Sequence, residues 1–140
     1  MYLSSTFEEL KDYRGAVFSA LEKAGLAVAR MENYTAADER PLDLCLRDVA
    51  QSDIYVGLFA WRYGYIPPQV HENPNGKSIT ELEYRHAEDR KLRKLLFFAH
   101  SDTNAAWPDQ FKDGSCATRF PRLLLPPLTG GSIRQLPRKA

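Results

Sequence analysis

Residues 78–87, Ser-Ile-Thr-Glu-Leu-Glu-Tyr-Arg-His-Ala, place a carboxylate where chemistry could use it. Ser78 followed three residues later by Glu81 is a capping box, which predicts that a helix begins here and explains Glu81 as a capping carboxylate. Glu83 falls on the stripe of this helix that should face inward. A carboxylate on a buried face is costly unless it is paired, uncharged or facing a cleft. Such groups concentrate at functional sites, so Glu83 is the candidate catalytic residue.

A run of hydroxyl side chains forms a second candidate site near the start of the chain. Ser4, Ser5 and Thr6 follow a short apolar run, and Ser5 with Glu8 forms another capping box, so a strand should run straight into a helix. In one interpretation these hydroxyls and the helix N-terminal amides bind a phosphate. In the other they only cap the helix. The sequence leaves both open.

Trp61, Arg62 and Tyr63 follow a nearly continuous apolar run at residues 54–60. The aromatic rings could stack on a base or a nicotinamide, and Arg62 could pair with a phosphate. Alternatively, Arg62 neutralises Glu83 while the aromatic rings pack under the following loop. His86 is more often a core or surface histidine than a general base, because no residue nearby orients it. No His or Cys spacing suits a metal, so no metal is predicted.

The elements that must position these residues alternate between strands and helices. Strands are predicted to end at residue 3 and to span residues 26–31, 54–60 and 95–99. Helices are predicted between residue 5 and Gly25, from Pro41 to about Ser52, and from Ser78 onward. This order predicts an α/β fold with three layers, a parallel sheet with right-handed crossovers and helices on both faces. The sheet should have four or more strands, with Leu3, Val28, Val56 and Leu96 on central or near-central ones.

Ligands of parallel sheets bind at the carboxyl ends of the strands. Three segments should gather there, and they supply the candidate substrate-binding residues Ser4, Ser5, Thr6, Phe7, Trp61, Arg62, Tyr63 and Ser78. The loop at residues 61–77 is long and rich in Pro and Gly, which is typical of a functional loop.

The 140-residue length suits one globular domain, predicted at residues 1–113. Residues 114–140 contain five basic and no acidic side chains together with several prolines, which predicts an irregular tail or linker. The chain as a whole has 19 basic and 18 acidic side chains, a balance that predicts neither a nucleic-acid nor a membrane partner. Whether the tail is a natural ending, a linker or a fragment boundary stays open.

Two cysteines, Cys45 and Cys116, do not form a disulfide framework, so we expect a reducing compartment. The first residues, Met-Tyr-Leu-Ser-Ser-Thr, contain neither a basic nor a long apolar region of a signal peptide. The expected location is cytoplasmic.

Three motifs in order resemble a TIR-like family of domains of unknown function. They are Leu3-Ser4-Ser5-Thr6-Phe7-Glu8-Glu9-Leu10, then Asp53-Ile54-Tyr55-Val56-Gly57 with Arg62-Tyr63-Gly64, and Ser78-Ile79-Thr80-Glu81-Leu82-Glu83-Tyr84. The resemblance covers about residues 1–100. It implies a flavodoxin-like or TIR-like fold, a position at the N-terminus of NACHT or STAND NTPases, and a following NTPase or repeat domain. More distantly, the chain resembles TIR domains and nucleoside deoxyribosyltransferases, in which a glutamate followed four residues later by alanine marks the catalytic position.

Glu83 and Ala87 have that spacing. The resemblance therefore implies a nucleotide ligand and cleavage of an N-ribosyl bond such as that of NAD, with NAD as substrate and no cofactor. One carboxylate suffices, because nicotinamide leaves without help from a general acid. The alternative is a non-enzymatic signalling module that forms a homo-oligomer on activation, in which Glu83 only holds its helix through an ion pair.

Overall fold

The computed structural model describes residues 1–31, 41–67, 73–99, 108–111 and 133–135. Its elements in chain order are β1 (Tyr2–Ser5), α1 (Lys11–Lys23), α2 (Pro41–Ala50), β2 (Ile54–Phe59), α3 (Ile79–Asp89), β3 (Arg93–Phe98), the 3-10 helix η3 (Asp109–Phe111) and β4 (Ile133–Gln135). The order of strands and helices agrees with the α/β prediction.

The described strands form one parallel sheet in the order β1-β2-β3-β4. Tyr2 pairs with Tyr55, and Val56 pairs with Leu95, so the apolar runs of β1, β2 and β3 lie side by side. This arrangement is consistent with a flavodoxin-like fold, as predicted. Val56 and Leu96 lie on its two central strands, as expected, whereas Leu3 lies on β1, the end strand of this order, which has only a single bridge on its other side.

The prediction of a full strand at residues 26–31 is wrong. Only a single parallel bridge joins Tyr2 to Ala29, with hydrogen bonds from Leu3 N to Ala29 O and from Ala29 N to Met1 O, each 2.9 Å. Val28 therefore lies beside β1 but on no strand. Leu26, at the start of the segment, is 42% exposed. Its side chain therefore gains little from burial, which would otherwise favour pairing of this segment with β1.

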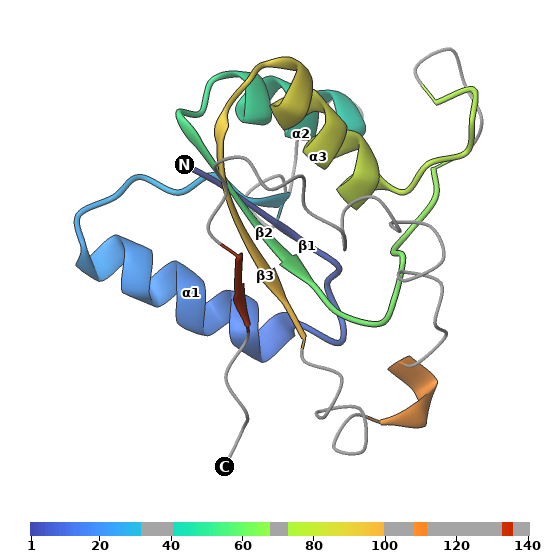
Figure 1. Cartoon of the computed structure of the whole chain (residues 1–140), viewed down its shortest axis with the longest axis horizontal. Helices are drawn as coiled ribbons and strands as arrows, with labels where there is room; N and C mark the ends of the chain where they lie inside the picture. Colours follow the sequence, from blue (N-terminus) through green and yellow to red (C-terminus); the bar gives the residue numbers. More distant parts are fainter. Residues whose placement is uncertain (32–40, 68–72, 100–107, 112–132, 136–140) are drawn as a thin grey trace.

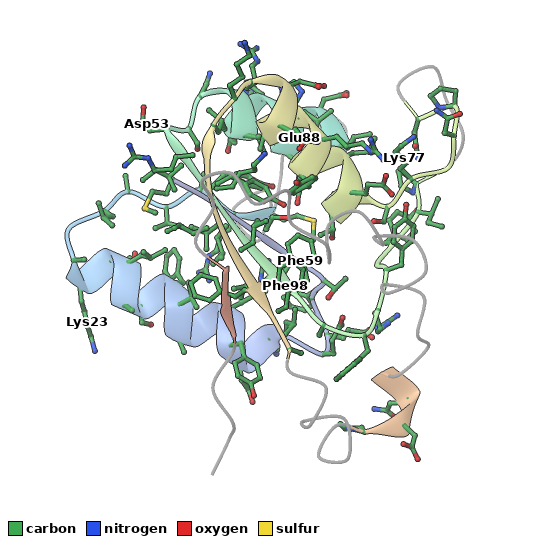
Figure 2. The ribbon with its side chains drawn as sticks, in the orientation of Figure 1. Lys23, Asp53, Phe59, Lys77, Glu88 and Phe98 are labelled. Carbon is green, nitrogen blue, oxygen red and sulfur yellow. The ribbon has the colours of Figure 1, made fainter. Side chains whose placement is uncertain are left out.

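Helices cover both faces of the sheet, with α1 on one side and α2 and α3 on the other (Figure 1). Alternation along the strands divides the core accordingly. The core on the α1 side contains Leu3, Leu10, Val56 and Leu58. The core on the other side contains Tyr2, Cys45, Val49, Tyr55 and Ala87. At one end of this second face, the rings of Phe59 and Phe98 from neighbouring strands stack at 5.2 Å (Figure 2).

The start of α1 differs from the prediction, and its end agrees with it. The residue before the helix is Leu10, which makes no side-chain cap, so the capping box of Ser5 and Glu8 does not form. Glu8 instead pairs with Arg62, and the Ser5 hydroxyl donates to Thr6 O at 2.7 Å. The helix ends in a Schellman motif, in which Gly25 N bonds Glu22 O and the next amide bonds Leu21 O. Gly25 has the predicted left-handed conformation, with φ 77°.

The expectation that residues beyond 113 contain no regular element is wrong for β4. Ile133–Gln135 pairs in parallel with β3, from Leu96↔Ile133 to Phe98↔Gln135. The reason is that the outer edge of β3 offers unpaired backbone groups, which stabilise a partner strand even where the local sequence pattern is weak. The other residues of the predicted tail lie outside the described part of the chain, and the boundary at residue 113 stays a prediction.

Candidate functional site

The helix that carries Glu83 begins where the sequence predicted. Ser78 is the N-cap of α3, and its hydroxyl oxygen accepts a hydrogen bond from Glu81 N at 3.2 Å. Ser78 itself is fully buried. From this start, Glu83 lies on the face of α3 that packs toward β1, and its side chain is only 3% exposed. The carboxylate is therefore buried between a helix and a strand.

Two hydroxyl groups of β1 bind the two oxygens of Glu83. The Tyr2 hydroxyl donates to Glu83 Oε1 at 2.6 Å, and the Ser4 hydroxyl donates to Oε2. Tyr2 and Ser4 are two residues apart on one strand, so their side chains lie on the same face of the sheet. Gly57 is the neighbour of Ser4 on β2. A Cβ at Gly57 would lie 2.6 Å from a ring carbon of Phe59, so the aromatic packing under α3 requires a glycine here.

Burial dominates the electrostatics of this site. It raises the pKa of Glu83, an effect that the hydrogen bonds of Ser4, Tyr2 and Cys45 and the charge of Arg14 oppose. Burial likewise raises the pKa of Cys45 to about 12 and the pKa of Tyr2 well above its ordinary value. The groups around Glu83 therefore keep their protons at neutral pH, and they act as hydrogen-bond donors rather than bases.

The alternative in which Arg62 neutralises Glu83 is wrong. Arg62 Nη1 lies 2.6 Å from Glu8 Oε2, and both side chains are partly exposed to solvent. Within the described residues, no Lys, Arg or His forms an ion pair with Glu83. Arg14, whose charge lowers the pKa of Glu83, donates to the Ser5 hydroxyl at 2.8 Å. Glu83 is thus held by hydroxyl groups, not by a cation.

Glu81 is buried as well, although it points to another side of α3. Its carboxylate was expected to bond the amide of Ser78, but it accepts hydrogen bonds from the Tyr63 hydroxyl and from Arg85 Nε, the latter at 2.6 Å. Only the half of the capping box that the Ser78 hydroxyl makes is therefore present. Tyr63, 4% exposed, joins the segment after β2 to α3.

The structure brings together the three segments that were expected at the carboxyl ends of the strands. Gly64, with φ 95°, lies so close to its neighbours that an added Cβ would be 2.9 Å from Thr6 Cγ2 and 3.8 Å from Ser78 Cβ. The ion pair of Arg62 with Glu8 joins the loop after β2 to the loop after β1. The loop after β1, the loop after β2 and the start of α3 therefore meet at this edge.

The remaining predicted binding residues at this edge differ in their exposure to solvent and in their hydrogen-bond partners. Ser5 accepts from Arg14, and the Thr6 hydroxyl donates to the Glu9 carboxylate, so both hydroxyls already have protein partners. Phe7 is 43% exposed. Trp61 is half-buried, and its Nε1 is buried without a hydrogen-bond partner. The phosphate-binding role of residues 4–6 stays a prediction, and simple capping of α1 by their side chains is wrong.

Sequence reasoning missed the residues that surround Glu83. Tyr2, Cys45 and Tyr55 come from β1, α2 and β2, and none of them was a candidate. The period-two spacing of Tyr2 and Ser4 was a usable signal, because it places a second hydroxyl on the face of Ser4. His86 is half-buried at the surface of α3, where burial and Arg90 lower its pKa.

The described residues add three facts on metals, thiols and membranes. No group of three or more His, Cys, Asp or Glu side chains among them is arranged to hold a metal ion. Cys45 is a free, buried thiol. No helix in this part of the chain is long and apolar enough to cross a membrane.

The parallel sheet with helices on both its faces is consistent with a flavodoxin-like α/β fold, and the buried carboxylate lies between α3 and β1 of this fold. The chain belongs to the DUF4062 family, a domain of unknown function, which it matches over residues 1–122. It is similar to telomerase protein component 1 of Mus musculus, with 34% identity over 90 residues, and to that of Rattus norvegicus, with 30% identity over 90 residues. Each match covers 52% of this chain, which spans about 3% of the length of these relatives.

Proposed function

We propose that this chain is a TIR-like effector domain in which Glu83 cleaves the N-ribosyl bond of NAD or a related nucleotide. The observation that carries the proposal is the orientation of Glu83 by the hydroxyls of Tyr2 and Ser4, with no ion pair from the described residues. In its ionised form, a carboxylate positioned in this way stabilises the positive charge that develops in the transition state. The spacing of Glu83 and Ala87, shared with the families that the sequence resembles, supports the same role.

The proposed chemistry needs one carboxylate and no cofactor. Nicotinamide leaves from a pyridinium that already carries a positive charge, so no general acid is required. Ionised Glu83 would bind ribose hydroxyls and stabilise the oxocarbenium-like centre. Because burial raises the pKa of Glu83, the ionised fraction, and turnover with it, should fall as the pH drops through that raised pKa.

The proposed setting is the N-terminus of a NACHT or STAND NTPase in the cytoplasm, followed by an NTPase or repeat domain. The 3% share of the relatives' length that this chain spans supports a module within a much larger protein. STAND ATPases form oligomers, so we expect the domain to act when several copies are brought together. The isolated chain should then be weakly active at low concentration.

The burial of Glu83 also favours a second candidate function, a non-enzymatic self-association module. The side chain is 3% exposed and both its oxygens accept hydrogen bonds, which is the arrangement that anchoring α3 to β1 requires. In this case the residue contributes to the fold, and the function is protein interaction.

Nicotinamide release from NAD at high protein concentration tests both candidates. Glu83→Gln keeps the size of the side chain and removes its charge, so turnover should fall by roughly 100-fold or more. Glu88→Gln is the matched control, because Glu88 lies on the same helix with its side chain 53% exposed (Figure 2). The control should release nicotinamide at the rate of the unsubstituted chain.

Thermal melts of the same variants separate lost chemistry from lost folding. Activity that survives Glu83→Gln, or that declines only as far as the folded fraction declines, ends the catalytic proposal. A chain that self-associates in light scattering but releases no nicotinamide at any concentration supports the interaction module. Turnover per molecule that is equal in dilute and concentrated solution contradicts activation by assembly.

A further inference from the structure

The contact between α3 and β1 is polar at its centre, which is unusual inside an α/β core. Tyr2 and Ser4 reach up from β1, and Glu83 reaches down from α3. All three residues are at most 3% exposed. We call this group the α3–β1 contact. The two hydroxyls can each donate only one hydrogen bond, and both are used on Glu83.

The titratable and charged groups that influence Glu83 supply little positive charge. They are Tyr2 from β1, Cys45 from α2, Tyr55 from β2 and Arg14 from α1. Three of these four are neutral when protonated, and burial raises the pKa of each of the three. Arg14 has the smallest of the influences that favour ionised Glu83. An ionised Glu83 therefore lacks the close cation that usually compensates a buried carboxylate.

We propose that Glu83 is a proton-operated switch in the α3–β1 contact, which holds α3 tightly on β1 while Glu83 is protonated and loosens α3 when Glu83 ionises. The sign follows from linkage. While α3 is packed on β1 (the closed contact), the pKa of Glu83 is raised, and once α3 detaches and Glu83 meets water (the open state), the pKa returns to its ordinary value. Glu83 therefore binds more protons in the closed contact than in the open state. The closed contact is therefore most stable below the ordinary carboxyl pKa, and it loses stability as the pH rises through the raised pKa of Glu83.

Hydrogen exchange of the α3 amides at a series of pH values measures this switch directly. After correction for the intrinsic exchange rate, the opening equilibrium constant of α3 should rise by up to about tenfold per pH unit between the ordinary carboxyl pKa and that of Glu83. In Glu83→Gln the same constant should be independent of pH over this window. Glu88→Gln should retain the pH dependence of the unsubstituted chain.

Titration of the Glu83 carboxyl carbon by NMR in the unsubstituted chain provides a second measurement, which needs no folded variant. Its midpoint should lie above the ordinary value of a glutamate carboxyl. An opening equilibrium constant of α3 that does not change with pH overturns the proposal. The proposal also fails if this constant depends on pH as steeply in Glu83→Gln as in the unsubstituted chain. A Glu83 midpoint at the ordinary value overturns it as well. None of these readouts requires NAD cleavage, so the switch and the proposed function can fail separately.

Discussion

Replacing Tyr2 by phenylalanine removes the hydroxyl that donates to Glu83 Oε1 at 2.6 Å and leaves the aromatic ring in place. The ring stacks on Tyr55 at 6.4 Å, so most of the packing should survive. A hydrogen bond to a charged group contributes about 1.5–3 kcal/mol to stability, and a bond between neutral groups about 1 kcal/mol. Tyr2→Phe should therefore cost about 2 kcal/mol while Glu83 is ionised and about 1 kcal/mol in a Glu83→Gln background.

A double-mutant cycle measured by urea unfolding isolates the interaction, which we expect to be about 1 kcal/mol above the raised pKa of Glu83. The Tyr2 hydroxyl lowers the pKa of Glu83, so its removal should raise that pKa further. In Tyr2→Phe the decline in stability with rising pH should then extend to higher pH. Equal costs of Tyr2→Phe in the two backgrounds at every pH would refute the reasoning, because the hydroxyl would then not act on the carboxylate.

Three further predictions concern single residues. Gly25→Ala should lower the free energy of unfolding by about 1–2 kcal/mol, because φ is 77° at this position. Gly15→Ala should raise it by about 0.5–1 kcal/mol, because Gly15 lies within α1 and an added Cβ would meet no atom within 4 Å. Chemical denaturation of the two variants measures the loss and the gain. Ser78→Ala should cost about 1 kcal/mol and increase hydrogen exchange in the first turn of α3, since the hydroxyl is its N-cap. In a Cys116→Ser background, Cys45 should react with a thiol reagent only as fast as the domain opens, because it is buried with a pKa of about 12; rapid reaction of the native chain would contradict this.

The parts of the fold that depend on local sequence were predictable. The apolar run of β2, the start of α2 at Pro41, the N-cap Ser78 and the left-handed Gly25 each follow from a few adjacent residues. Residues only a few positions apart in the sequence determine these burial patterns and dihedral angles. The α/β order of the elements followed from them.

The errors concern partners that lie far apart along the chain. Glu8 was assigned to a helix cap, but its partner Arg62 is 54 residues away. The hydrogen bond of Tyr2 with Glu83 spans 81 residues. Local patterns identified Glu83 as a buried acid that needed an explanation, but they contained no information on which side chains the sheet would place against it.

The pairing of β4 with β3 has a consequence for any shortened form of this chain. The family match ends at residue 122, before β4 begins. A chain cut there would expose the edge of β3 at Leu96, Phe97 and Phe98, the uncharged end of a strand that begins with Arg93 and Lys94. Such an edge is a template for strands of other molecules, so the shortened chain should aggregate on expression. The three residues of β4, which lie beyond the end of the family match, should therefore protect this edge.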